Sequence, residues 1–138
     1  MGASPGYLEE AQPVPSKLLQ MAGDVNGLLA VNKSFSLKFA NNLDTYNRQA
    51  AAAWMSKNSL RLVVHNDDDK VAKITLKLDK AVFAKDGWNE KTITKGKVFA
   101  VTPEGEKIVP FKVSLQGNDL VFTGTTPAFG SLYLFADK

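Results

Sequence analysis

From residue 34 onward, apolar and polar residues alternate along the chain. Phe35, Leu37 and Phe39 are separated by polar residues, and the same period of two recurs over residues 60–64 and 74–78. This period places apolar side chains on one face of a strand, as in a half-buried β-strand. Further strands are predicted where Val, Ile, Phe and Leu are concentrated, in segments 97–102, 107–115, 119–124 and 131–136.

Turn-forming residues separate these segments. Residues 66–70 are rich in Asn and Asp, residues 102–105 contain Pro and Gly, and residues 116–119 contain Gly and Asn. Turns spaced by about 8–12 residues are typical of antiparallel sandwiches and barrels. We therefore predict an all-β protein, mainly an antiparallel β-sandwich or jelly-roll-like fold of about 7–8 strands.

One segment, residues 44–55, favours a helix. It begins with Asp44, a good N-cap residue, and contains four consecutive alanines. Tyr46, Ala50 and Trp54 recur at a spacing of four, which places them on one helical face. We predict one short helix here that ends near residue 57, with Trp54 in the core.

The first 33 residues differ from the rest. They contain three of the six prolines but only one of the 13 aromatic residues. Ser16 is placed to cap a short helix over residues 17–21, which Gly23 would end. We predict an extended N-terminal arm over residues 1–33 and a β-sandwich domain over residues 34–138. The apolar residues of this arm are its candidate interface anchors: Tyr7, Leu8, Val14, Leu18, Leu19 and Met21.

Composition limits the possible chemistry. The chain has 138 residues, 44% of them hydrophobic, with no cysteine and one histidine. This length suits one domain, and the composition excludes disulfides, thiolate zinc sites and multi-histidine metal centres. The formal net charge of +3 is a small excess. No apolar run is long enough to cross a bilayer, and the first ten residues do not resemble a secretory signal, so we expect neither a membrane partner nor export.

Candidate catalytic groups are few. His65 precedes an acidic turn, and Ser131 lacks the glycine that would follow it in a nucleophile elbow. A small enzyme that uses His65 with Asp67 or Asp69 is the weakest function class. Asp67–Asp69 lack the spacing of a calcium loop and are interpreted as a solvated turn. We therefore predict no enzyme activity, no cofactor and no metal site.

A basic segment spans residues 70–97, with eight lysines against three acidic residues. Lysines interleaved with Phe83 and Trp88 could bind single-stranded nucleic acid. Lysines that alternate with apolar residues are more typical of the solvent face of a strand, so we do not expect specific nucleic-acid binding. Residues 86–89 are predicted to form a loop with Trp88 as an exposed binding aromatic.

The layout of a β-sandwich with an extended N-terminal arm resembles that of virus and phage shell proteins. This resemblance implies a non-enzymatic structural subunit, a capsid or shell-associated protein that self-associates through its arm. Its partners would be copies of itself or other shell proteins. Its location would be the virion, or the host cytoplasm during assembly.

An alternative comes from residues 96–135, which loosely resemble the terminal β-domains of bacterial glycosidases. This resemblance implies an accessory or carbohydrate-binding β-sandwich module of a glycoside-active enzyme. Trp88 and Tyr133 would then form an exposed platform on which sugar rings stack. Both function classes use the same fold, so the fold cannot decide between them.

Overall fold

The computed structural model describes residues 16–31, 35–39 and 51–138 and consists mainly of two antiparallel β-sheets. The six-stranded sheet has the spatial order β1 (Leu29–Ala30), β3 (Ala51–Met55), β4 (Ser59–His65), β10 (Ser131–Asp137), β6 (Lys97–Thr102) and β7 (Gly105–Val109). The four-stranded sheet has the order β2 (Phe35–Phe39), β5 (Ala72–Asp79), β9 (Asp119–Thr126) and β8 (Lys112–Gln116). The predicted all-β, antiparallel fold is confirmed.

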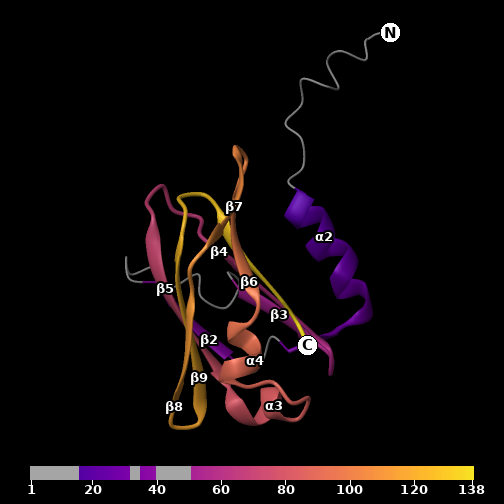
Figure 1. The fold of residues 1–138 in the computed structure, drawn as a ribbon. Helices are drawn as coiled ribbons and strands as arrows, with labels where there is room; N and C mark the ends of the chain where they lie inside the picture. The colour runs from indigo at the N-terminus through magenta and orange to yellow at the C-terminus, as the bar shows by residue number, and fades with distance from the viewer. Residues whose placement is uncertain (1–15, 32–34, 40–50) are drawn as a thin grey trace, which may run out of the picture.

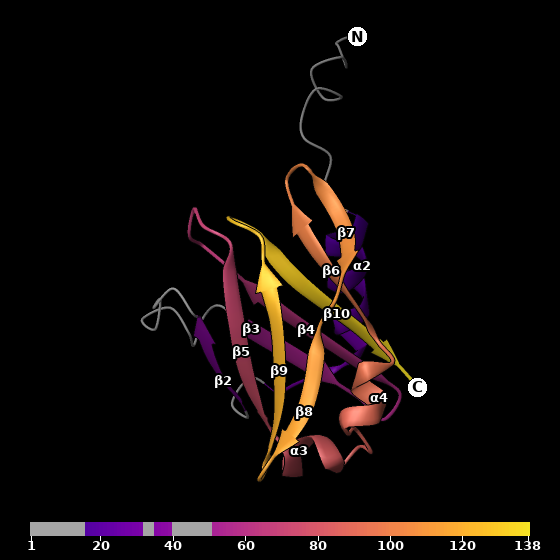
Figure 2. The same cartoon turned by 60° about the vertical axis from the view of Figure 1, so that its left-hand side comes forward.

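The main core lies between the two sheets, which form separate layers in Figure 2. The alternation predicted for the central strands is present in β5, where Ile74, Leu76 and Leu78 are buried and the residues between them are more exposed. Strands β4 and β10 are buried over most of their length, because a helix covers the outer face of their sheet. Both faces of β4 and β10, in the middle of the six-stranded sheet, are therefore packed, whereas the edge strands β1 and β7 are largely exposed.

Segment 107–115 is not one strand, which corrects the prediction. Its first part lies in β7 of the six-stranded sheet and its second part in β8 of the four-stranded sheet. The chain changes sheet at Pro110 and Phe111, between the two strands. Proline has no N–H to donate to a strand ladder, so it suits this crossing point. The predicted hairpin turns at 102–105 and 116–119 are confirmed, with Gly117 at φ +61°.

The helix predicted over residues 44–55 is wrong where the structure describes it. Ala51–Met55 form strand β3, which pairs antiparallel with β4. Ala51, Ala53 and Met55 are buried in the core, while Trp54 lies on the other side of the strand and is half-buried. Pairing with β4 thus overrides the helix propensity of the alanines. The start of the predicted helix, residues 44–50, lies outside the described residues.

Three helices accompany the sheets in the described part of the chain. Helix α2 (Ser16–Asp24) covers the predicted segment 17–21 and continues past Gly23 into a 3₁₀ turn at Val25–Gly27. Helices α3 (Lys80–Ala84) and α4 (Glu90–Thr94), which the sequence interpretation missed, lie between β5 and β6. Figure 1 shows α2 on the outer side of the six-stranded sheet and the two short helices at one end of the molecule.

Candidate functional site: the contact between helix α2 and the sheet

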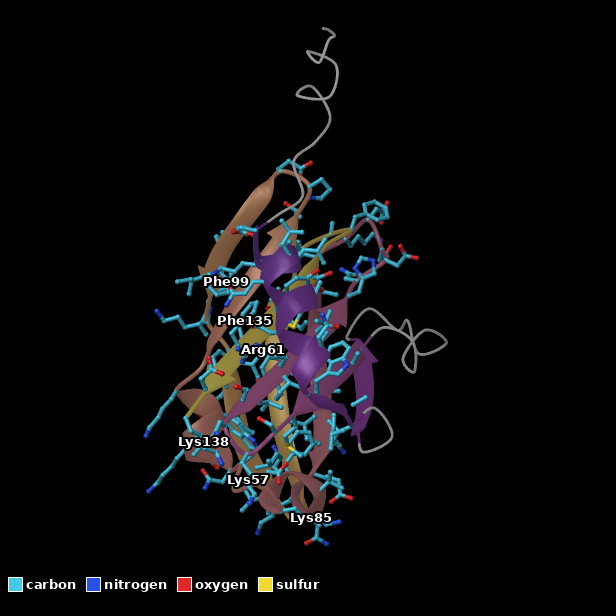
Figure 3. All side chains as sticks on the ribbon, turned by 90° about the vertical axis from the view of Figure 1, so that its right-hand side faces the viewer. Lys57, Arg61, Lys85, Phe99, Phe135 and Lys138 are labelled. Carbon is cyan, nitrogen blue, oxygen red and sulfur yellow. The ribbon has the colours of Figure 1, made fainter. Side chains whose placement is uncertain are left out.

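Helix α2 lies across the outer face of the six-stranded sheet. Met21 is its one buried residue, at 4% exposure, and forms a second apolar cluster with Val101 of β6 and Tyr133 of β10. Val63, Phe99 and other half-buried residues pack against this cluster. In Figure 3, Phe99, Phe135 and Arg61 lie in a row beside the helix. We call this contact the α2 interface.

A carboxylate of β7 binds the N-terminal end of α2. The Ser16 hydroxyl donates a hydrogen bond to Oε1 of Glu106, and the backbone N–H of Lys17 donates to Oε2 at 3.0 Å. The first N–H groups of a helix lack partners within the helix and favour a negative charge. The hydrogen bonds from Ser16 and Lys17 stabilise the carboxylate and lower the pKa of Glu106.

An ion-pair cluster holds the C-terminal end of α2. Nε of Arg61 lies 2.9 Å from a carboxylate oxygen of Asp24, and Nη1 lies 3.0 Å from Oδ1 of Asp137. Nη1 also donates to the carbonyl oxygens of Leu60 and Ala136. Arg61 is only 5% exposed, and these partners satisfy most of its donors.

Arg61 and Asp137 shift each other's pKa. Burial alone would lower the pKa of Arg61, but hydrogen bonds and charges from Asp137 and Asp24 raise it above its ordinary value. Burial alone would raise the pKa of Asp137, but hydrogen bonds from Arg61 and Ser59, with the charge of Arg61, lower it overall. Both side chains are therefore held in their charged forms.

Aromatic rings form the middle of the α2 interface. Phe99 and Phe135 meet edge to face, with ring centroids 5.8 Å apart. The ammonium of Lys17 lies 4.4 Å from the centroid of Phe99, and the guanidinium of Arg61 lies 5.2 Å from that of Phe135. Both distances are within the range of cation–π attraction. Hydrogen bonds to the carboxylate of Glu106 thus hold one end of α2 and the ion pair with Arg61 holds the other, while apolar and cation–π contacts hold the helix in between.

The predicted interface anchors fall into three groups. Tyr7, Leu8 and Val14 lie outside the described residues. Leu18 and Leu19 are exposed, at 40% and 61%, and are available to a partner. Met21 is buried against the protein's own sheet, because it is the residue of α2 that faces Val101 and Tyr133. Their role in assembly stays a prediction.

The prediction of exposed binding aromatics is wrong. Trp88 is 1% exposed, and its indole N–H donates to the carbonyl oxygen of Ser56 at 2.7 Å. Phe83 is also buried, so neither ring is available for stacking on nucleic-acid bases. Tyr133 lies beneath α2, where burial raises the pKa of its phenol. These large rings fill the molecule's own cores, and neither Trp88 nor Tyr133 forms a sugar platform.

His65 lies at the end of β4 and is exposed, as predicted. Its Nδ1 is 2.9 Å from the hydroxyl oxygen of Ser131, its cross-strand neighbour, and its Nε2 is 3.9 Å from a carboxylate oxygen of Asp67. The second distance exceeds a hydrogen bond, so Asp67 does not orient the ring. Nothing local in the sequence connects Ser131 to His65, because only the pairing of β4 with β10 makes them neighbours.

The acidic turn after His65 is organised by Asn66. The side-chain amide of this buried residue donates to the carbonyl oxygens of Lys70 and Pro127 and accepts from the N–H of Asp68. Among the described residues, no group of three or more His, Asp or Glu side chains is arranged to hold a metal ion. No helix in the described ranges has the length and apolar character required to cross a membrane.

The fold and the α2 interface define an antiparallel, two-sheet β-protein with its N-terminal helix fastened across one sheet. Comparison of the chain with protein-family models, curated proteins and solved structures finds no match.

Proposed function

We propose that the protein is a non-enzymatic structural subunit of a larger assembly, of the virion or shell type, and that it associates with copies of itself through its N-terminal segment. The observation that carries this proposal is the pair of adjacent, exposed leucines on α2, Leu18 and Leu19. The inward side of the helix already has its contacts through Met21, Asp24 and Lys17. The leucines are left for a partner to cover.

The position of α2 supports the same proposal. The helix starts beside Glu106 of β7, an edge strand of the six-stranded sheet. Fixed contacts at both of its ends hold the helix in one orientation, so that Leu18 and Leu19 are presented in a defined place. A presented pair of apolar side chains suits repeated identical contacts between subunits, as in symmetric assemblies. In this proposal the protein resides in the virion, or in the host cytoplasm during assembly.

The test is the mass of the protein in solution. We expect the wild-type chain to sediment as an oligomer and the double variant Leu18→Ser/Leu19→Ser to shift to smaller species with an unchanged circular dichroism spectrum. Ile108→Ser is the control, because Ile108 is an equally exposed apolar residue on β7. A wild-type chain that is monomeric at every concentration, or a double variant that assembles normally, would contradict the proposal.

A second candidate function is carbohydrate binding, at a different place from the buried Trp88 and Tyr133. Lys73, Thr75, Lys112, Thr123 and Thr125 line an open groove of about 360 Å³ on the four-stranded sheet. Hydroxyl and ammonium groups suit the hydrogen-bonding groups of sugars. A glycan array tests this function: binding that is weakened by Lys112→Ala favours a sugar-binding module, and no binding to any glycan removes it.

A further inference from the structure

A second cavity lies at the end of the molecule where α3 and α4 meet the β8–β9 hairpin. Its volume is about 410 Å³, within the range of small-molecule sites. Residues of both helices and both strands line it, and the ones that matter here are Lys80, Ala84, Trp88, Lys91, Leu115 and Leu120. We call it the α3–α4 pocket.

The floor of the α3–α4 pocket is apolar and preformed. Trp88 and Leu120 are buried, and the hydrogen bond from the indole of Trp88 to Ser56 fixes the ring. Leu115 pairs with Leu120 across the hairpin but is 46% exposed. An exposed leucine beside two buried apolar residues leaves room for an apolar ligand to extend this end of the core.

The rim of the pocket is cationic. Lys80 begins α3 and Lys91 lies in α4, and both are exposed. Within the part of the chain that the structure describes, neither ammonium group forms an ion pair. Glu90 is the one acidic lining residue, and its Oε2 accepts a hydrogen bond from the N–H of Leu115 at 3.1 Å. Its carboxylate is thus partly committed to holding α4 on β8.

The other polar lining group is also engaged within α4. The side chain of Asn89 accepts a hydrogen bond from the N–H of Thr92, and the hydroxyl of Thr92 accepts one from the N–H of Asn89. This capping box fixes the start of α4. The capping box uses the side-chain oxygen of Asn89, so the polar groups that face a ligand are the two ammonium groups and the side-chain NH2 of Asn89, above an apolar floor.

We propose that the α3–α4 pocket binds a small amphiphilic anion, whose apolar chain lies on the exposed side chain of Leu115, beside the buried Leu120 and Trp88. Its carboxylate or comparable anionic group lies between Lys80 and Lys91. Lys80 and Lys91 belong to the basic segment 70–97, so part of this segment would bind an anion without any exposed aromatic ring. This binding does not depend on self-association, because none of these residues belongs to the α2 interface.

The test compares octanoate with octanol, which has the same chain length but no charge. Binding to the full-length chain is followed by the fluorescence of Trp88 in a Trp54→Phe background, which removes the other tryptophan. We expect octanoate to give a saturable change below its micelle-forming concentration and octanol to bind more weakly. The double variant Lys80→Met/Lys91→Met should weaken octanoate binding about two- to tenfold, the size of one or two exposed ion pairs, and leave octanol binding unchanged.

Two further variants separate pocket binding from general effects. Leu115→Asp should abolish binding of both probes. Lys107 lies on β7, outside the pocket, so Lys107→Met should leave the binding of both probes unchanged. Circular dichroism establishes that each variant is folded. The proposal is wrong if octanoate gives no saturable signal, if octanol and octanoate respond equally to the double lysine variant, or if Lys107→Met weakens octanoate binding as much as that variant does.

Discussion

Arg61 shows at the residue scale how one charged side chain can serve two parts of the fold. It lies on β4, yet it bonds to Asp24 at the end of α2 and to Asp137 at the end of β10. Its guanidinium also contacts the ring of Phe135. A planar group with five donors can make these contacts at once, which a lysine cannot do. The ion pair therefore helps to specify where α2 docks.

The lowered pKa of Asp137 predicts a pH dependence of stability. Its ordinary value is 3.8, and the folded value lies below it. The stabilisation is fully present above the unfolded pKa and is lost as the pH falls through the lower, folded pKa. Asp137→Asn should therefore reduce the free energy of unfolding by about 1 kcal/mol at pH 7, since the carboxylate is largely exposed. The difference in the free energy of unfolding between wild type and variant should shrink as the pH falls below about 4, and it should vanish below the folded pKa of Asp137.

Urea unfolding of both proteins between pH 7 and pH 2 measures this difference. Glu104→Gln, at an exposed carboxylate in the β6–β7 turn, is the control and should change stability by less than about 0.5 kcal/mol. If the free energies of unfolding of wild type and Asp137→Asn differ by the same amount down to pH 2, the lowered pKa of Asp137 is contradicted.

At the scale of elements, α2 depends on the sheet for its stability. A nine-residue helix is too short to be stable alone in water, so its contacts with the sheet must hold it. The sequence places Lys17, Met21 and Asp24 at helical spacings of four and three, and each contacts the sheet. Leu18 and Leu19 fall outside this set and remain exposed.

Met21→Ala should therefore weaken the docking of α2 more than a change at either exposed leucine. We expect a loss of about 2 kcal/mol, the low end for a buried methionine, because the helix can shift into the space. Hydrogen exchange should accelerate in α2 and not in β5 or β9. Leu19→Ala, measured at a protein concentration at which the chain is monomeric, is the matched control and should cost less than about 0.5 kcal/mol. Equal effects of the two substitutions would show that Met21 is not the anchor.

The sheet connections decide the architecture at the scale of the whole molecule. Between the described strands the chain passes from one sheet to the other six times, and the connections β4 to β5 and β9 to β10 are two of these. Asn66 joins the two, because its amide bonds to Lys70 in the first and to Pro127 in the second. Its own backbone N–H donates to the carbonyl oxygen of Gly130. One buried side chain thus ties this end of the sandwich.

Asn66→Ala should lower the free energy of unfolding by about 3 kcal/mol, because it leaves buried carbonyl groups without donors. Urea unfolding measures the loss. Asn118→Ala, an exposed asparagine in the β8–β9 turn, should change stability by less than about 0.5 kcal/mol. If the two substitutions cost the same, Asn66 does not tie the connections together.

Local pattern was enough to predict most of the strands, because period-two alternation and turn residues act over a few neighbouring positions. The strand at 97–102 has the predicted bounds, and the hairpin turns at 102–105 and 116–119 are where Pro, Gly and Asn indicate them. The alanine-rich segment misled the prediction, because its conformation depends on pairing with β4. Pro110 is a local signal of the break between β7 and β8, because proline cannot donate to a strand ladder.

The site residues were harder to predict, because burial depends on which elements cover a side chain. Trp88 sits in a polar loop and looks exposed, yet its indole is buried and bonds to Ser56, 32 positions away. Tyr133 lies in a continuous apolar run, residues 132–136, and only the position of α2 buries its face of β10. Contacts between Glu106 and Ser16, or between Arg61 and Asp24, have no local signature at all.

The sequence by itself determined the class of fold, the proline-rich and aromatic-poor composition of the first 33 residues, and the absence of cysteine chemistry. These properties follow from composition and from interactions between near neighbours. The tertiary structure decided that α2 covers the protein's own sheet, that Trp88 and Tyr133 are buried, and that an apolar pocket with two lysines lies between α3 and α4. Those features arise where segments distant in sequence meet, and packing between such segments is set by the whole fold.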